Sequence, residues 1–307
     1  MGMAEDSPHT GSAELAESMG YRIITDATAD LSSEMLCKFP SVNRVPMEVT
    51  LDDDRYLYGE PDALTADRFY KRLRAGSYGS TSQISPASYE EFWRPYLASG
   101  EDILYLCFSS GMSGTLQSAG IAAEDLRREY PERKLRILDT LGASIGEGLL
   151  VYEAAEKQAQ GMPLEELCTW IELHKLEVCH RFTVDRFEFL LHGGRVSAAQ
   201  ATLGTMLQIK PLLRVDEQGM LSVLQKPRGR KKAIIALLSQ MEAGWKPELS
   251  RTVIVGHGGN PQLGQELSDS VSARFPEADL HIAEIGPIIG AHTGPDMMAP
   301  TYWGSNR

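Results

Sequence analysis

Short apolar runs alternate with amphipathic segments over the first part of the chain. Buried strands are predicted at three of these runs: 21–25, 103–108 and 135–138. Apolar residues recur at spacings of three and four between Leu116 and Tyr130, which indicates one face of a helix. Two more helices are predicted, at about 147–160 and 164–178. Because alternating strands and helices are typical of βαβ units, we expect a largely parallel sheet within residues 21–180.

The pattern changes after Cys179 and becomes mixed. Apolar runs at 211–215 and 220–224 flank the polar segment 216–219, which indicates a hairpin. The other predicted elements are strands at 182–184, 252–255 and 280–285 and helices at 197–208, with Ser197 as N-cap, and at 262–275. A length of 307 residues suits two domains at about 150 residues each. We therefore predict an extension at 1–20, an α/β domain at 21–180 and a smaller mixed domain at 181–307.

Composition narrows the classes of function. Hydrophobic residues make up 42% of the chain and charged residues 23%, which is typical of a globular protein. A net charge of −12 disfavours nucleic acid as a general partner and disfavours binding across an anionic membrane surface. No apolar run approaches the roughly 18–20 residues that cross a bilayer, so no membrane span is expected, while transient membrane contact stays open.

The cysteines and the N-terminal residues 1–20 suggest a cytoplasmic location. The four cysteines form no C-x-x-C pair, which excludes a zinc ribbon, and no metal site is predicted. Widely spaced cysteines in a long chain fit a reducing environment. Residues 1–20 have neither the basic nor the apolar region of a signal peptide, so they are expected to be a flexible extension of a cytoplasmic protein.

The segment 109–115, Ser-Ser-Gly-Met-Ser-Gly-Thr, is the strongest candidate for a ligand site. It lies between a predicted buried strand and a predicted helix, where free N–H groups and the helix dipole favour an anion. Ser110, Ser113 and Thr115 add hydroxyl donors. The alternative is that these residues only make the turn and cap the helix. The segment lacks the Gly-Lys-Ser/Thr of a nucleotide loop and does not match G-x-S-x-G.

Other polar segments are weaker candidates, each with a structural alternative. Thr81 and Ser82 belong to a hydroxyl cluster that could instead cap a helix, and His292 lies in a Gly- and Pro-rich loop that shapes either a ligand contact or a structural hydrogen bond. Arg195 follows two glycines and is a candidate for phosphate recognition or a surface ion pair. Five cations in 226–232, Arg228 among them, form either a docking surface or a solvated helix start.

Two further motifs are better explained by structure than by chemistry. Three adjacent aspartates at 52–54 could suggest a metal, but their side chains would point in different directions, and a solvated turn is favoured. The segment 256–259, Gly-His-Gly-Gly, weakly matches an oxyanion-hole motif, and a strand-to-helix turn is favoured.

Taken together, the ordered motifs resemble the DegV family of bacterial fatty-acid-binding proteins over about residues 21–299. The residues that carry the resemblance are Ile-Thr-Asp-Ala-Thr-Ala-Asp-Leu at 24–31, Thr-Ser-Gln at 81–83, the segment 109–115, Gly-Gly-Arg-Val-Ser at 193–197, Lys-Pro at 210–211 and Ile-Gly-Pro-Ile-Ile-Gly-Ala-His-Thr-Gly-Pro at 285–295. Two positions depart from the family pattern. His192 stands where Lys or Arg commonly precedes Gly-Gly-Arg, and Asp296 stands where Gly commonly follows His-x-Gly-Pro.

The resemblance implies a two-domain α/β fold with a ligand tunnel between a Rossmann-like parallel-sheet domain and a smaller mixed α/β domain. It implies one long-chain fatty acid as ligand, with its carboxylate held by Thr81, Ser82, Ser113 and His292. It further implies a non-catalytic protein without a cofactor that presents the acid to a separate fatty acid kinase, which makes acyl phosphate. Arg195 and Arg228 are then candidate contacts for the phosphate or the kinase.

Two other classes of function stay open at this stage. A serine hydrolase acting on acyl esters would use Ser113 as nucleophile and His292 as base, although no orienting aspartate is evident. A pure interaction protein would dock through the basic segment 226–232.

Overall fold

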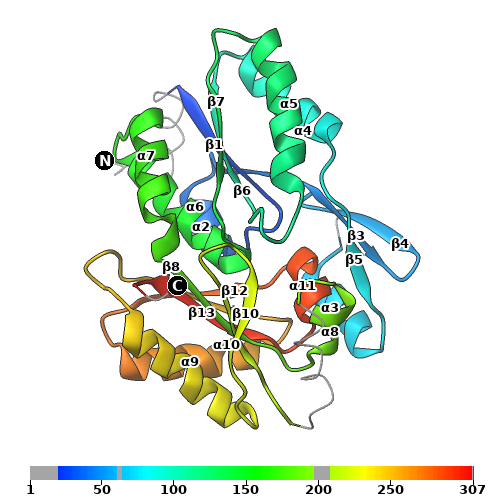
Figure 1. Cartoon of the computed structure of the whole chain (residues 1–307), viewed down its shortest axis with the longest axis vertical. Coiled ribbons are helices and arrows are strands. Elements are labelled where there is room, and N and C mark those ends of the chain that lie inside the picture. The colour runs from blue at the N-terminus through cyan, green and yellow to red at the C-terminus, as the bar shows by residue number, and fades with distance from the viewer. Residues whose placement is uncertain (1–19, 61–63, 197–207, 306) are drawn as a thin grey trace, which may run out of the picture.

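Three β-sheets organise the chain in a computed structural model, which describes residues 20–60, 64–196, 208–305 and 307 (Figure 1). The first sheet is parallel, in the order β2 (Asn43–Val45), β1 (Tyr21–Asp26), β6 (Asp102–Cys107), β7 (Leu135–Asp139). The second is mixed, in the order β10 (Leu221–Gln225), β9 (Leu212–Val215), β8 (Val178–Thr183), β13 (Met298–Trp303), β11 (Thr252–His257), β12 (Asp279–Glu284). The third is antiparallel: β4 (Asp54–Tyr58), β3 (Met47–Leu51), β5 (Gly79–Thr81).

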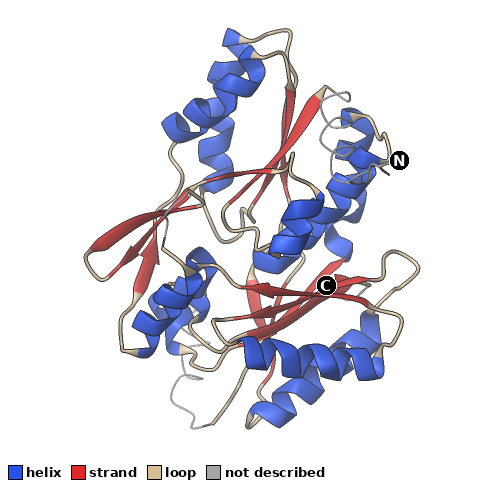
Figure 2. Cartoon of the chain, turned by 180° about the vertical axis from the view of Figure 1, so that it is seen from behind, coloured by secondary structure: helices blue, strands red, loops and turns tan. Residues whose placement is uncertain are grey.

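The helices cover both outer faces and fill the space between the two larger sheets (Figures 1 and 2). The parallel sheet carries α4 (Pro86–Ala98) and α5 (Thr115–Glu129) on one face, and α9 (Arg230–Gly244) and α10 (Pro261–Arg274) cover the outer face of the mixed sheet. Between them lies α6 (Ser144–Ala159), which is buried nearly all round because strands of both sheets contact it. The other helices within the described residues are α2 (Ser33–Lys38), α3 (Ala66–Arg74), α7 (Leu164–His174), the 3₁₀ turn η1 (Lys175–Glu177), α8 (Glu188–His192) and α11 (Pro287–Thr293).

The expected α/β architecture, a parallel sheet followed by a mixed one, is confirmed. The hairpin is confirmed as β9 and β10, which pair antiparallel. The mixed sheet begins at Val178, and the division of the chain into domains near residue 180 stays a prediction. The predicted helix at 197–208 with its cap Ser197, and the extension at 1–20, fall almost entirely outside the described residues.

Two helix boundaries differ from the prediction. The helix predicted from 147 begins three residues earlier, because Ser144 adopts a left-handed φ of 55° and starts α6 directly after a sharp turn. The helix predicted to reach Val178 ends at His174, since the next residues tighten into η1 and Val178 already belongs to β8.

The third sheet was not predicted. It places the three adjacent aspartates at the β3–β4 turn, where Arg72 binds Asp52 and Asp54 at 2.8 Å each. The interpretation of this segment as a turn is therefore confirmed. Across the described ranges, no group of three or more His, Cys, Asp or Glu is arranged to hold a metal ion. Among the described helices, none combines the length and apolar character needed to cross a membrane.

Candidate functional site

A cavity of about 830 Å³, counting the solvent at its mouth, lies between the two larger sheets. The parallel register pairs Cys107 with Asp139, so the turns that follow β6 and β7 meet at one edge of the parallel sheet. Ligands of open α/β sheets bind at this carboxyl edge. The lining is mostly apolar and includes Met47, Phe108, Met112, Ile145, Phe182, Leu190, Val215, Leu221, Ile288, Ile289, Met297 and Ala299.

Polar side chains of the cavity meet where β5 contacts α11. Thr81 Oγ1 and His292 Nε2 are 3.0 Å apart, although the two residues are separated by 211 positions in the sequence. Both line the cavity. Ser113 lines it as well, and its Oγ lies 2.7 Å from Thr115 Oγ1 at the start of α5. The structure thus brings three of the predicted head-group residues to one cavity.

His292 is held in a tight and largely dry position. Burial, together with the nearby charges of Arg195 and His192, lowers the pKa of His292 to about 4, so the imidazole is neutral at pH 7. Its Nδ1 atom is buried and has no hydrogen-bond partner among the described residues. Behind the ring lies Gly193, where a Cβ atom would stand only 2.2 Å from Nδ1. Glycine at 193 therefore makes room for the imidazole.

Ser82 lies apart from this group. It is exposed, it is not among the residues that line the cavity, and its Oγ donates to Glu48 Oε1 at 2.9 Å. Strand alternation explains the difference, since successive side chains leave a strand on opposite faces. A role for Ser82 in holding a carboxylate stays a prediction.

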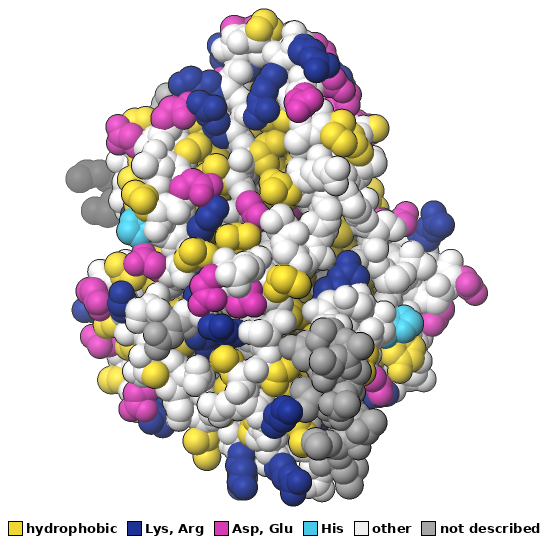
Figure 3. Space-filling model, in the orientation of Figure 1, with side chains coloured by type: hydrophobic (Ala, Val, Ile, Leu, Met, Phe, Trp, Pro, Cys, Tyr) yellow, Lys and Arg dark blue, Asp and Glu magenta, His cyan; other side chains and the backbone are white. Residues whose placement is uncertain are grey.

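The candidate arginines occupy different places. Arg195 lines the cavity, and its Nη1 donates to the carbonyl of Gly193. Arg228 is exposed and does not line the cavity. His192 is also exposed, with its ring centroid 4.7 Å from that of Tyr78. The Lys and Arg side chains of the basic segment 226–232 are exposed, and Figure 3 shows basic side chains near the lower end of the face in view.

The glycine-rich turn after β6 is occupied by contacts within the chain. A Cβ on Gly111 would lie 2.5 Å from the carbonyl of Gln218, so this glycine allows the β9–β10 hairpin to approach. Ser109 Oγ donates to the carbonyl of Gly219 at 2.7 Å. At the start of α5, Gly114 offers no side-chain cap, but the N–H of Thr115 donates to Ser113 Oγ at 3.3 Å.

A buried cluster of acids, which the sequence did not indicate, lies behind the cavity wall. Asp26 and Glu147 are fully buried, and Thr28 Oγ1 is hydrogen-bonded to both carboxyl groups. The Thr28 hydroxyl has a single hydrogen and can donate only one of these two hydrogen bonds. A protonated carboxyl group must therefore donate the other bond to the hydroxyl oxygen. Asp26 already accepts from two backbone N–H groups and from Tyr105, which assigns the proton to Glu147. Burial and the neighbouring Asp26 charge raise the pKa of Glu147 well above its usual value, which agrees with a proton on Glu147.

Ser113 and His292 do not form a nucleophile–base pair within the described structure. Each is hydrogen-bonded to a threonine instead, Ser113 to Thr115 and His292 to Thr81. Catalysis by a Ser–His pair requires the two side chains to be within hydrogen-bond reach of one another. The serine hydrolase hypothesis is therefore not supported.

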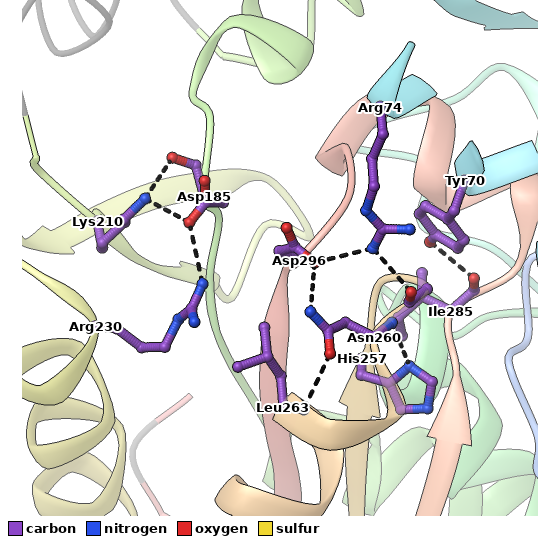
Figure 4. Close-up of polar contacts among 11 residues, drawn as sticks. Tyr70, Arg74, Asp185, Lys210, Arg230, His257, Asn260, Leu263, Ile285 and Asp296 are labelled. Atoms are coloured by element: carbon purple, nitrogen blue, oxygen red, sulfur yellow. Dashed lines mark hydrogen bonds and ion pairs between the residues drawn. The ribbon is translucent and has the colours of Figure 1, made fainter. Parts of the chain in front are cut away.

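The segment 256–259 is a strand-to-helix turn, as interpreted from the sequence. Asn260 caps α10 through a contact from the N–H of Leu263 to its Oδ1, and its own N–H donates to His257 Nδ1 at 3.3 Å (Figure 4). Burial lowers the pKa of His257. These contacts give His257 a structural role.

Comparison with known proteins places these features in one family. The family described as uncharacterised DegV proteins matches residues 21–303. A DegV domain-containing protein of Clostridium perfringens is 36% identical over 287 residues, which are 94% of this chain and 98% of that protein. A fatty-acid-binding DegV family protein from Thermus thermophilus has a TM-score of 0.80 at 30% identity, covering 93% of this chain and 99% of that one.

The fold extends to more distant proteins. The Streptococcus pneumoniae Fatty Acid Kinase B3 protein, whose structure is loaded with linoleic acid, has a TM-score of 0.81 at 22% identity. The alignment covers 93% of this chain and 99% of that protein. At this identity the likeness concerns the fold alone.

Proposed function

Because this chain belongs to the DegV family, we propose that it binds one long-chain fatty acid in the cavity between its two larger sheets. The observation that carries the proposal is a largely apolar cavity that has a polar corner where Thr81 meets His292. Each buried methylene contributes about 0.8 kcal/mol, so the acyl tail supplies most of the affinity. The polar corner then sets the orientation of the acid.

The carboxylate is held by hydroxyl donors around the neutral His292. With its proton on Nε2, His292 donates to Thr81 Oγ1, and the Thr81 hydroxyl hydrogen is free for a carboxylate oxygen. The hydroxyl of Ser113, at the start of α5, supplies a further donor. Arg195 adds a positive charge at the cavity.

Extraction of the purified protein tests this function directly. Mass spectrometry of the organic extract is expected to detect a long-chain fatty acid at close to one per chain, and the delipidated protein is expected to bind added palmitate or oleate. A protein that carries no acid and binds neither added acid would overturn the proposal.

Loss of the Ser113 hydroxyl should weaken binding. A hydrogen bond to a charged group contributes about 1.5–3 kcal/mol, so Ser113→Ala is expected to raise the Kd for oleate by roughly 10- to 100-fold. Ser82→Ala is the matched control, because Ser82 is exposed and donates to Glu48. Calorimetric titration of both variants with oleate measures the difference. Equal weakening by both would instead assign Ser82 to the head-group site.

We also propose that a separate fatty acid kinase phosphorylates the bound acid, through attack of a carboxylate oxygen on the γ-phosphorus of ATP with ADP as leaving group. The family resemblance supports this step, as do the exposed Arg228 and the cavity-lining Arg195, which are cations suited to phosphate or to an acidic partner. The chain itself then carries the acid and does not catalyse.

Charge reversal at Arg228 tests the partner role. Arg228→Glu is expected to lower acyl-phosphate formation roughly tenfold when the kinase of the same organism and ATP are supplied, because like charges oppose docking. Acid binding should not change, since Arg228 does not line the cavity. Arg128→Glu on α5 is a control, with a side chain 74% exposed. Acyl-phosphate formation unaffected by Arg228→Glu would remove this arginine from the contact.

A further inference from the structure

Two segments that are distant in the sequence lie against each other beside the polar corner of the cavity. The first, residues 74–81, runs from the end of α3 into β5, and the second, residues 285–296, contains α11. Three contacts join residues 74, 79 and 81 of the first segment to residues 296, 291 and 292 of the second. Arg74 Nη2 lies 2.9 Å from Asp296 Oδ1, Thr81 is bonded to His292, and a Cβ on Gly79 would stand 2.9 Å from the Cβ of Ala291.

The C-terminal side of α11 is held by a small polar network (Figure 4). Arg74 Nη2 donates to Asp296 Oδ1 and, at 2.8 Å, to the carbonyl of Gly259. Asn260 Nδ2 donates to the same Asp296 oxygen at 2.8 Å. We call the contacts of Arg74 with Asp296 and Gly259 the clasp. The clasp joins the end of α3 to the loop that follows α11.

Asp296 adopts a backbone conformation that usually favours glycine. Its φ is 62°, and its N–H donates to the carbonyl of Gly258 at 2.8 Å. Aspartate tolerates the left-handed region better than most residues do, but a glycine would occupy it without strain. Aspartate at this position therefore carries a backbone strain that glycine would avoid, and its carboxylate accepts from Arg74 and Asn260.

The helix between these contacts cannot hold its position alone. With seven residues, α11 is far shorter than the 12–15 at which isolated helices become even marginally stable. Before its N-terminal end, the carbonyl of Ile285 accepts from Tyr70 and the N–H of Gly286 donates to Asp30. Arg74 supplies the tie from α3 on the C-terminal side, four residues beyond His292.

We propose that Arg74 and Asp296 are positioning residues for the head-group site, whose clasp sets the placement of His292 against Thr81 and thereby the residence time of the acyl ligand. This inference rests on the proposed function. Neither residue lines the cavity, so the clasp acts through α11 and not by touching the acid.

Removing either partner of the Arg74–Asp296 ion pair should weaken the clasp. Arg74→Gln removes the guanidinium, and Asp296→Gly removes the carboxylate while keeping a residue suited to a φ of 62°. Each is expected to accelerate oleate dissociation roughly three- to tenfold, and because both remove the Arg74–Asp296 ion pair, the double variant should fall short of the product of the two single effects. The two substitutions change the net charge in opposite directions, so a long-range charge effect would move the dissociation rates apart.

Three further variants calibrate the result. Lys71→Gln on the same helix removes an exposed ion pair with Asp67, whose side chains are 72% and 73% exposed, and is expected to leave dissociation unchanged. Arg74→Lys keeps the charge and should restore part of the residence time. Asp296→Asn keeps an oxygen acceptor and the tolerance for a left-handed φ, and should lie between the wild type and Asp296→Gly.

The pKa of the His292 imidazole reports on the clasp in the absence of ligand. Burial and the charges of Arg195 and His192 hold its pKa at about 4. A loosened corner admits water, so the NMR titration of His292 should move to higher pH in Arg74→Gln and Asp296→Gly but not in Lys71→Gln.

The outcomes separate the two proposals. If the wild type binds no fatty acid, the proposed function fails, whatever the clasp variants show by NMR. If the wild type binds oleate while Arg74→Gln and Asp296→Gly match it in dissociation rate and in His292 titration, the clasp has no positioning role and the inference is overturned.

Discussion

Alanine at position 193 is expected to reduce fatty-acid binding by roughly a hundredfold or more, with the fold retained. The new Cβ would stand 2.2 Å from His292 Nδ1, so the imidazole must leave its place and give up its contact with Thr81. The backbone itself accepts alanine, because Gly193 has φ −69° and ψ −14° at the end of α8. The expected loss corresponds to about 3 kcal/mol, the cost of breaking a well-formed buried polar contact.

Gly120→Ala is the matched control for this glycine. Gly120 lies inside α5 with nothing within 4 Å of an added Cβ. Alanine there should stabilise the protein by up to about 1 kcal/mol and leave binding unchanged. Calorimetric titration with oleate and thermal unfolding of both variants give the comparison. Normal binding by Gly193→Ala would mean that His292 moves freely or that it takes no part in holding the acid.

Removing the carboxyl group of Asp30 is expected to change how stability depends on pH. Asp30 is only 4% exposed and accepts hydrogen bonds from Ser144 Oγ at 2.6 Å and from the N–H of Gly286 at 2.8 Å. Burial, which outweighs these bonds and the nearby charge of Arg44, raises its pKa from 3.8 to about 7. A rise of that size corresponds to a free-energy difference on the order of 4 kcal/mol.

The direction follows from proton binding. A carboxyl group with a raised pKa binds its proton more tightly in the folded state, so its stabilising effect is complete below its unfolded pKa near 4 and is lost as the pH rises to about 7. Asp30→Asn, which cannot ionise, should therefore gain unfolding free energy relative to the wild type as the pH rises from 4 to 8. The gain should level off above pH 7.

Denaturant unfolding at a series of pH values measures this difference. Asp67→Asn serves as the control, because the Asp67 side chain is 73% exposed, and its curve should run parallel to that of the wild type. A constant offset between Asp30→Asn and the wild type over pH 4–8 would show that Asp30 keeps an ordinary pKa and would contradict the expected coupling.

The central elements of both larger sheets could be predicted from local patterns. Strands such as β6 are continuous apolar runs, and α5 shows a helical period, so each is recognisable from neighbouring residues alone. The sheet of β3, β4 and β5 could not be found in this way. Its third strand has three residues, and it exists through pairing with β3, whose Val49 lies opposite Thr81.

The same distinction between local pattern and tertiary packing applies to the candidate site. Candidate polar residues could be named from motifs, but the contact between Thr81 and His292 depends on how two distant segments pack. The buried acids were missed because ionisable residues are expected at the surface. Only the fold shows that Glu147, in a helix enclosed by two sheets, lies within hydrogen-bond distance of Thr28.

The long sequence separation within the polar corner also bears on how the protein is made. Thr81 and Ser113 leave the ribosome early, whereas His292 follows Thr81 by 211 residues. During synthesis the first sheet can form while α11 has not yet been translated. At that point Thr81 is present but the imidazole of His292 is missing. The contact between Thr81 and His292, and any binding that depends on it, can therefore form only after residue 292 has left the ribosome.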